Sequence, residues 1–193
     1  MARVFVALWP DDRTRSEVAE EIDRLRPLCR AIAWVPPLNL HLTLKFLGEQ
    51  PEPRLADALG GLAEAVEGRA AFSIALHGVG AFPGMERARI LWIGVATGAL
   101  DVRALQSSVD AALAARGFPG DERPWHPHLT VGRVFDPRRW RREATPVLQE
   151  SIARAATRAF GAFPVSRVSL VRSDLSATGA RYSEIDSVSL AGT

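Results

Sequence analysis

Residues 39–47 read Asn-Leu-His-Leu-Thr-Leu-Lys-Phe-Leu, and the centre of that stretch returns 87 residues later. His41-Leu42-Thr43-Leu44 and His128-Leu129-Thr130-Val131 share the pattern His-x-Thr-x, with apolar and polar residues alternating. Alternation with a period of two is typical of a strand that buries one face. One such motif alone would indicate only a half-exposed strand. The chain has just four histidines, so two copies of the pattern favour a shared chemical role.

The spacing of these motifs has a chemical use. Residues i and i+2 of a strand project from the same face, so each motif aims one imidazole and one hydroxyl in the same direction. If the two strands face each other across a groove, these groups converge. Imidazole titrates near neutral pH, so one of His41 and His128 can accept a proton while the other donates one. The hydroxyls of Thr43 and Thr130 can hydrogen-bond phosphate oxygens. Such a site suits in-line displacement at phosphorus without a metal.

Positive charge stands beside each motif. Lys45, the only lysine, continues the alternation of His41 and Thr43 and is therefore predicted on their face. The same alternation places Phe46 in the core. Arg133 follows His128 by five positions, so a regular strand would turn it away. Gly132 can mark a β-bulge, and we expect a bulge there to bring Arg133 onto the face of His128. Lys45 and Arg133 are accordingly predicted phosphate ligands, the alternative being solvated basic side chains.

Strand-like and helix-like segments alternate along the chain. No G-x-G-x-x-G follows a strand and no G-x-x-x-x-G-K-[ST] occurs, so the pattern favours an α+β fold with antiparallel strands over a doubly wound nucleotide-binding fold. Strands are expected at 4–9, 39–47, 72–79, 89–95, 128–134, 165–171 and 181–190, a strand leading into a turn at 34–37, and helices at 14–26, 54–66, 100–116 and 147–159.

Composition sets wider limits on what the protein can be. With 193 residues, 47% of them hydrophobic and 24% charged, the chain can form one globular domain over residues 1–193. Cys29 is alone, which excludes a disulfide framework. The start lacks the apolar stretch of a signal peptide, and no segment approaches a membrane span of about 18 apolar residues. We therefore expect a cytoplasmic monomer. A net charge of +2 is too small for broad coating of nucleic acid.

Further segments connect the two motifs with a known family. Residues 34–36 leading to 41–48 resemble its first signature, 126–133 its second, 3–7 its opening strand, and 171–175 with 179–182 its closing hairpin. The chain thus resembles the 2H phosphoesterase superfamily. Within that superfamily it is similar to the bacterial and archaeal RNA 2′,3′-cyclic phosphodiesterases, also called 2′-5′ RNA ligases. The resemblance covers nearly the whole chain.

This resemblance implies a bilobal α+β fold, with two interleaved lobes that are each an antiparallel sheet flanked by helices. A pseudo-two-fold axis would relate the lobes, and the active groove would lie between them. The implied reaction hydrolyses a 2′,3′-cyclic phosphate end of RNA to a 2′-phosphate. The family can also join such an end to a 5′-hydroxyl, reversibly and without ATP, forming a 2′-5′ bond. No cofactor or metal is implied.

Carried over to this sequence, the resemblance makes His41 the general acid that protonates the departing 3′-oxygen and His128 the base that activates water. Thr43, Thr130 and Arg133 would hold the phosphate. The two histidines are exchangeable by sequence, so their roles stay open at this point. Two other functions also stay open. The substrate could be a small cyclic nucleotide, or the protein could be an RNA-binding module with vestigial catalysis.

Several residues outside the two motifs also have side chains that could bind a metal or RNA. His126 and His128 form a His-x-His pair, but His77 is the only other histidine available for a third zinc ligand, so a structural role for His126 is favoured. Aromatic side chains that could stack on a nucleobase are Trp125, Trp140 and Tyr182. The basic stretch Arg138–Arg142 could contact RNA backbone or be a solvated loop.

Overall fold

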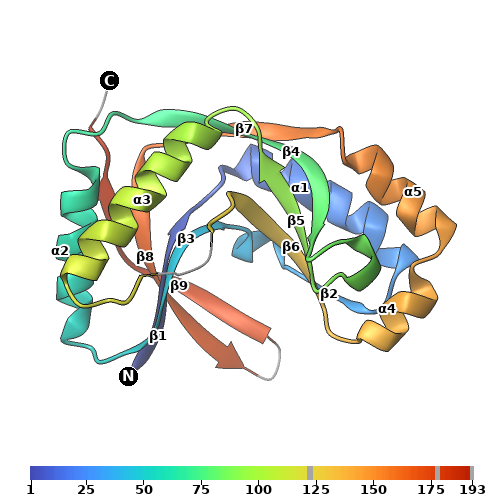
Figure 1. Cartoon of the computed structure of the whole chain (residues 1–193), viewed down its shortest axis with the longest axis horizontal. Helices are drawn as coiled ribbons and strands as arrows, with labels where there is room; N and C mark the ends of the chain where they lie inside the picture. Colours follow the sequence, from blue (N-terminus) through green and yellow to red (C-terminus); the bar gives the residue numbers. More distant parts are fainter. Residues whose placement is uncertain (121–123, 177–178, 192–193) are drawn as a thin grey trace.

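The computed structural model describes residues 1–120, 124–176 and 179–191. Its strands form one curled sheet in the order β7-β4-β5-β6-β3-β1-β8-β9, with β2 paired to β6 (Figure 1). All of these strand pairs are antiparallel. The strands are β1 (Ala2–Leu8), β2 (Ile32–Trp34), β3 (Leu42–Gln50), β4 (Phe72–Phe82), β5 (Ile90–Val95), β6 (His128–Val134), β7 (Ala159–Val165), β8 (Arg167–Ser176) and β9 (Gly179–Ser189).

The sheet divides at its centre, where β3 and β6 are joined by the single pair Leu42–Leu129. On one side lie β3, β1, β8 and β9, which we call the first half-sheet. On the other side lie β6, β5, β4 and β7, the second half-sheet, with β2 beside β6. The two halves are interleaved in sequence, because β4 crosses into the second half-sheet while β8 returns to the first. The predicted α+β architecture of two antiparallel sheets is therefore confirmed, with the addition that the sheets meet in one pair.

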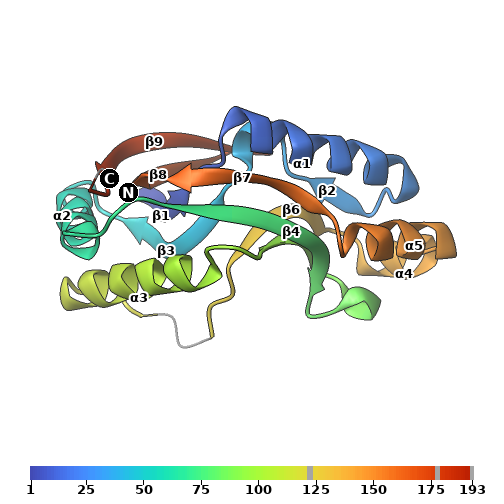
Figure 2. The same ribbon diagram turned by 90° about the horizontal axis from the view of Figure 1, so that it is seen from above.

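The helices cover the outside of this sheet at its two ends (Figures 1 and 2). Helix α2 (Arg54–Val66) packs against α3 (Ala99–Ala115) and β9 at the end of the first half-sheet. Helices α1 (Asp12–Leu25), α4 (Pro137–Glu143) and α5 (Pro146–Ala155) lie at the other end, where α1 contacts β7 and α5 contacts β4. Among the described residues, no helix is long and apolar enough to cross a membrane.

Local sequence explains where these helices begin and which face they bury. In α1, Val18, Ile22 and Leu25 are buried at helical spacing, so they place one apolar stripe on the sheet. The side chain of Asp11 accepts a hydrogen bond from the Thr14 amide at 2.8 Å and caps this helix. Asp136 caps α4 in the same way, accepting from two backbone amides of its first turn.

Two expectations for local structure were wrong. The basic stretch after β6, for which a solvated loop was one of two expectations, contains α4, because Asp136 and the proline at its first position form a strong helix start. The predicted helix 147–159 ends at Ala155, and Ala159–Val165 is strand β7 instead. Pro164 concealed this strand, yet a proline is tolerated there because β7 is an edge of the sheet. The strand and turn expected at 34–37 are present, since β2 ends at Trp34 and a short 3₁₀ turn follows over Pro37–Asn39.

Candidate functional site

The two His-x-Thr motifs lie side by side at the centre of the curled sheet. Leu42 and Leu129, the apolar residues between each histidine and threonine, form the pair that joins the half-sheets, and both are fully buried. In the register of that pair, His41 lies opposite Thr130 and Thr43 lies opposite His128. All four of these polar side chains are partly exposed, on the face away from the buried leucines. The predicted convergence of the two motifs on one face is therefore present.

His41 and His128 adopt the same tautomer, because each forms the same kind of hydrogen bond to the backbone. The Nδ1 atom of His41 lies 2.6 Å from the carbonyl oxygen of Asn39, and Nδ1 of His128 lies 2.8 Å from that of His126. A carbonyl oxygen only accepts hydrogen bonds, so each Nδ1 must carry the proton. In the neutral ring, Nε2 is then the proton acceptor. His126 thus contributes its backbone carbonyl, which accepts the hydrogen bond from His128.

An aromatic ring packs edge-to-face on each of the two imidazoles. The ring of Tyr182 lies 5.2 Å from that of His41 at an interplanar angle of 89°, and Phe82 lies 5.2 Å from His128 at 88°. On the His41 side, Phe5 and Trp9 add further ring contacts at 4.8 and 5.6 Å. These rings fix the imidazole planes and shield them from water. Of the three stacking candidates from sequence, Tyr182 alone contacts a motif histidine.

This packing lowers the pKa of both histidines. Burial is the largest cause for His41, whose pKa falls to about 4, and the positive charges of Arg133 and His128 lower it further. The pKa of His128 is also lowered, chiefly by burial and then by Arg133 and His126. The backbone carbonyl that accepts from each Nδ1 acts in the opposite direction. In the ligand-free protein, both imidazoles are therefore predominantly neutral at pH 7.

Arg133 lies where the sequence predicted, because strand β6 contains a bulge. Gly132 is opposite Leu91 and Thr130 is opposite Trp92, so Val131 is the extra residue. The bulge lies one position before the expected Gly132, and it turns Arg133 to the exposed side of the strand. A Cβ on Gly132 would approach Ile32 to 2.6 Å, so a larger residue does not fit in this strand position. The positive charge of Arg133 lowers the pKa of both histidines.

Lys45 does not lie on this face, and the prediction that it binds phosphate is corrected. Strand β3 has its own bulge, with Lys45 opposite Val6 and Thr43 opposite Ala7, so Leu44 is the extra residue. The bulge turns Lys45 inward, where its side chain is only 2% exposed and forms an ion pair with Asp110. Its ammonium also donates a hydrogen bond to the Pro119 carbonyl at 2.7 Å.

Phe46 takes the outward place that sequence alternation had given to Lys45. It is 59% exposed rather than in the core. Its ring lies 6.0 Å from that of Phe5, which in turn contacts His41. The repeat itself carried a signal for this position, since Phe46 precedes Arg133 by the same 87 residues that separate the two histidines. Phe46 is therefore the counterpart of Arg133 in the first half-sheet.

Trp125, three residues before β6, is held on the first half-sheet. The Trp125 indole N–H donates to the Thr43 carbonyl at 3.2 Å, and Arg103 donates to the Trp125 carbonyl at 3.2 Å. These bonds connect the backbone of one motif with the chain entering the other. Trp140, by contrast, is buried and donates to the Met85 carbonyl at 3.0 Å, so it belongs to the core.

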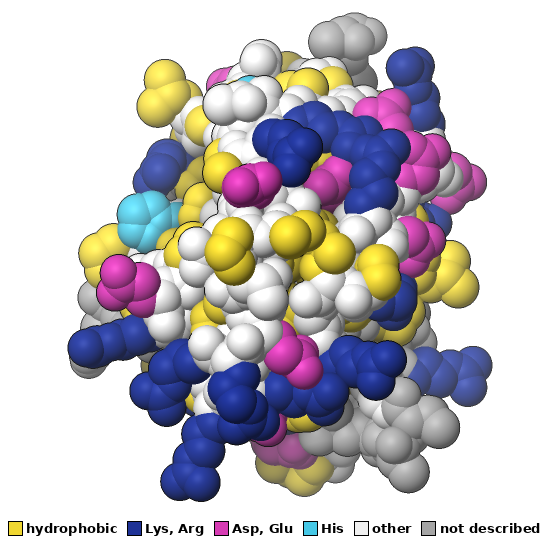
Figure 3. All heavy atoms as spheres, turned by 90° about the vertical axis from the view of Figure 1, so that its right-hand side faces the viewer, with side chains coloured by type: hydrophobic (Ala, Val, Ile, Leu, Met, Phe, Trp, Pro, Cys, Tyr) yellow, Lys and Arg dark blue, Asp and Glu magenta, His cyan; other side chains and the backbone are white. Residues whose placement is uncertain are grey.

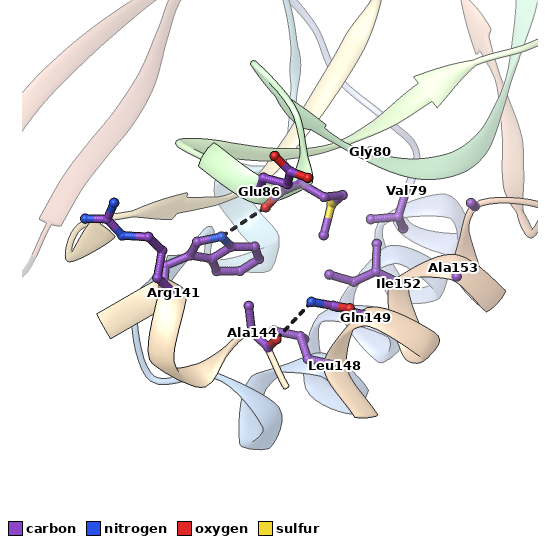
Figure 4. Close-up of a pocket in the computed structure, with 12 residues that line it drawn as sticks. Val79, Gly80, Glu86, Arg141, Ala144, Leu148, Gln149, Ile152 and Ala153 are labelled. Carbon is purple, nitrogen blue, oxygen red and sulfur yellow. Dashed lines mark hydrogen bonds between the residues drawn. The ribbon is translucent and has the colours of Figure 1, made fainter. Parts of the chain in front are cut away.

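No metal ligand set accompanies the motifs within residues 1–120, 124–176 and 179–191, because no three His, Cys, Asp or Glu side chains gather there. A cavity of about 490 Å³ lies elsewhere, between α4, α5 and the β4–β5 connection (Figure 4). Its lining includes Val79, Leu148 and Ile152 and none of the motif residues. The side-chain N–H groups of Trp140 and Gln149 there already donate to backbone carbonyls. This cavity is therefore separate from the histidines.

Comparison with known proteins places the chain in a family. The model of the 2′-5′ RNA ligase superfamily matches residues 14–177. The chain belongs to this superfamily. The resemblance read from the sequence is thereby confirmed, and the match contains both motifs together with Arg133.

Relatives within the superfamily are similar over almost their full length. A protein of Methanothermobacter thermautotrophicus named RNA 2′,3′-cyclic phosphodiesterase is 34% identical over 184 residues, which cover 95% of this chain and 96% of that protein. A protein of Aquifex aeolicus with the same name is 31% identical over 193 residues, covering 100% and 99%. The chain and these relatives therefore match over nearly the whole length of each.

Solved structures agree with the architecture. The crystal structure of TT0787 of Thermus thermophilus superimposes with a TM-score of 0.76 at 33% identity, covering 98% of each chain. The crystal structure of E. coli LigT complexed with 3′-AMP gives a TM-score of 0.74 at 23% identity, again covering 98% of each chain. At that identity the second likeness concerns the fold alone.

Proposed function

We propose that this protein hydrolyses the 2′,3′-cyclic phosphate end of RNA to a 2′-phosphate by acid–base catalysis with His41 and His128. The observation that carries the proposal is the matched pair of imidazoles. Each donates from Nδ1 to a backbone carbonyl, so each keeps Nε2 for proton transfer. Full-length relatives named RNA 2′,3′-cyclic phosphodiesterase support this substrate.

In the proposed reaction, a water oxygen attacks phosphorus in line with the bond to the 3′-oxygen. One imidazole takes a proton from the water while the phosphorus–3′-oxygen bond breaks. The other imidazole, protonated, gives its proton to the departing 3′-oxygen. The products are a 2′-phosphate and a 3′-hydroxyl. Thr43 and Thr130 donate hydrogen bonds to the non-bridging oxygens, and Arg133 balances the negative charge that develops on them.

The assignment of His41 as acid and His128 as base follows the family resemblance. The electrostatics of the ligand-free protein favour the reverse, because the pKa of His41 is lowered to about 4 and the acid must carry a proton. A bound phosphate brings negative charge that raises the pKa of both rings. Replacement of the 3′-oxygen by sulfur separates the two assignments. A thiolate leaves without protonation, so activity on this substrate returns in the variant that lacks the acid and stays low in the one that lacks the base.

The same geometry supports a reversible ligation. A 5′-hydroxyl in the place of water would attack the cyclic phosphate, and the new bond would be a 2′-5′ phosphodiester. No nucleotide cofactor is needed, because one phosphodiester bond replaces another. We therefore propose hydrolysis with ligation as its counterpart when 5′-hydroxyl ends are abundant.

The decisive experiment incubates the protein with an oligonucleotide that ends in a 2′,3′-cyclic phosphate and identifies the product end. A 2′-phosphate formed in the presence of EDTA supports the proposal, since the two imidazoles supply both proton transfers. A 3′-phosphate contradicts it. Turnover of mononucleoside 2′,3′-cyclic phosphates but not of oligonucleotides would favour the alternative of a small cyclic nucleotide substrate. Salt-dependent RNA binding without turnover would favour a binding module.

The exposed Phe46 adds a surface for a nucleobase next to the histidines. Its ring joins Phe5 and, through it, His41 in a row of aromatic contacts. Stacking on an aromatic side chain is tolerant of base identity. We propose that the terminal nucleotide lies with its phosphate toward Arg133 and its base toward Phe46.

A further inference from the structure

Arginines gather on helix α4, directly after the strand that carries His128. Arg138, Arg141 and Arg142 are exposed there. Within the part of the chain that the structure describes, no carboxylate lies within 4.0 Å of their guanidinium groups. Arg139 differs from them, because it forms an ion pair with Glu143. Three cations on one short helix are thus left without an acidic partner.

Further arginines border this helix from neighbouring segments. Arg87 and Arg89 are exposed in the β4–β5 connection. That connection packs on α4 through the Trp140 bond to Met85, and Val134 donates to the Arg89 carbonyl at 2.9 Å. The backbone of Arg30 donates to the Glu143 carboxylate at 2.6 Å. We call this surface the basic face, formed by Arg30, Arg87, Arg89, Arg138, Arg141 and Arg142.

Positive charge is concentrated in the segments that carry the basic face. Residues 85–90 and 133–143 together with Arg30 hold eight arginines against three carboxylates, a net charge of +5. The whole chain has a net charge of +2, so the remainder carries a net charge of −3. Figure 3 views this end of the molecule and shows basic side chains gathered along its lower part, where Figure 1 places α4. A local excess of this kind attracts polyanions although the protein as a whole is nearly neutral.

The basic face is continuous with the histidine site. Strand β6 runs from His128 past Arg133 and ends just before Phe135 and α4. From His128 to Phe135 the strand advances about 23 Å at 3.3 Å per residue. Phe135 is 63% exposed, so an aromatic ring stands between the site and the arginines. Aromatic and basic side chains in this order suit the bases and phosphates of a single strand.

We propose that the basic face binds single-stranded RNA on the 5′ side of the cyclic phosphate. A cyclic phosphate occupies the 3′ end of its strand, so every other nucleotide extends in the 5′ direction from the site. The guanidinium groups match phosphate oxygens in geometry and charge, and Phe135 offers a stacking surface. This inference rests on the proposed function for the identity of the reacting end. It adds that the protein selects polymers over mononucleotides.

The binding test compares two variants, each with three arginines replaced by glutamine, one on α4 and one on or beside α1. One variant carries Arg138→Gln, Arg141→Gln and Arg142→Gln. Its control carries Arg13→Gln, Arg24→Gln and Arg26→Gln, exposed positions of or beside α1 with the same change in net charge. The probe is a labelled RNA of about 12 nucleotides with a 3′-hydroxyl, a length within the usual range of single-strand sites. Fluorescence anisotropy gives Kd at several salt concentrations.

We expect RNA binding by the α4 variant to depend less steeply on salt than binding by the wild-type protein. Each phosphate contact on a single strand contributes about 0.7 to the slope of log K against log salt, so three lost contacts make the slope shallower by about 2. Between 50 and 200 mM salt the wild-type affinity should then fall about 20-fold more than that of the variant. The control keeps the wild-type slope. Equal slopes in both variants, or displacement of the probe by polyglutamate as readily as by unlabelled RNA, would overturn the proposal.

A kinetic test separates this proposal from the proposed function. The α4 variant should keep its kcat/KM on a mononucleoside 2′,3′-cyclic phosphate and lose about ten-fold on a cyclic-ended oligonucleotide at low salt. Equal losses on both substrates would contradict a role limited to the RNA strand. If the wild-type protein turns over neither substrate, the proposed function fails, while the salt slopes still decide whether the basic face binds RNA.

Discussion

The two half-sheets position their His-x-Thr motifs through the same bulge, hydrogen bond and ring contact. They differ in the side chains that follow each motif. Each strand has a bulge directly after the threonine, at Leu44 in β3 and at Val131 in β6. Each histidine donates from Nδ1 to the carbonyl two residues earlier, and each receives an aromatic ring edge-to-face at 5.2 Å. The geometry needed for proton transfer is therefore duplicated.

The residues after each bulge are not duplicated. The inward position holds Lys45 in one half and Gly132 in the other, and the outward position holds Phe46 and Arg133. One side of the site is thus an exposed aromatic ring and the other an exposed cation. In the proposed reaction this difference would orient the substrate, because a nucleotide has a base at one end and a phosphate at the other.

The largest effect on activity should come from removing either of the two histidines, which form the duplicated part of the site. His41→Ala and His128→Ala should each lower kcat by about 10²- to 10⁴-fold, the contribution of a positioned acid or base. The double variant should be little worse than either single one, since the two rings act as a unit. Steady-state kinetics on a cyclic-ended oligonucleotide gives these values, with circular dichroism as the control for folding. Near wild-type turnover in either single variant would remove that histidine from the mechanism.

The outward positions should give unequal effects, which sharpens the comparison. Arg133→Gln should lower kcat by about 10²-fold, because a preorganised donor to the charged oxygens is lost. It should also raise the pKa of both histidines, since the Arg133 charge now lowers them. Phe46→Leu should mainly raise KM, as expected for a stacking surface. Histidine NMR titration and a comparison of kcat with KM test both statements. Equal changes in kcat from the two variants would contradict the assignment of Arg133 to the phosphate and of Phe46 to the base.

The sequence could predict the parts of the site that repeat. Alternation in residues 41–44 and 128–131 indicated the strands, and the shared His-x-Thr pattern brought the two histidines together. The position of Arg133 also followed, because Gly132 marked an irregular strand. Lys45 was misplaced because the equivalent bulge in β3 falls at Leu44, and an ordinary apolar residue gives no local sign of a bulge.

The aromatic rings that pack on the two histidines could not be predicted from local sequence patterns. Phe82 and Tyr182 reach the site from β4 and β9, strands whose places depend on long-range pairing. Phe46, however, could have been found by carrying the 87-residue offset through to Arg133. Equivalence between repeats was here a better guide than strict alternation, since both copies bend at the same position.

Lys45 should affect stability rather than phosphate binding. Its side chain is almost fully buried, and Asp110 is its ionic partner. Lys45→Met leaves Asp110 without that partner, which should lower the free energy of unfolding by about 3 kcal/mol. The double variant Lys45→Met, Asp110→Leu should recover part of this loss, because no unpaired charge remains. Urea unfolding measures the energies. A variant that is fully stable but binds the cyclic phosphate poorly would contradict this assignment.

The low pKa of His41 should make the folded protein acid-sensitive. An ordinary histidine has a pKa near 6.5, whereas that of His41 in the folded state is about 4. The unfolded chain therefore binds more protons between these values, and stability present above pH 6.5 is lost as the pH falls toward 4. The full difference corresponds to about 3 kcal/mol. In His41→Gln, the free energy of unfolding should decline less steeply over this window. Identical slopes in urea unfolding would contradict the pKa.

The smallest effect should come from loosening the connection between the two motif strands. The indole of Trp125 donates to the Thr43 carbonyl, so it links the first motif to the segment that enters the second. Trp125→Phe keeps an aromatic ring and removes only the donor. It should cost about 1 kcal/mol of stability, the usual net worth of one hydrogen bond. If the bond also aligns the two histidines, kcat should fall a few-fold while KM and the histidine pKa values hold. A loss of stability with unchanged kcat would show that the half-sheets keep their alignment without this hydrogen bond.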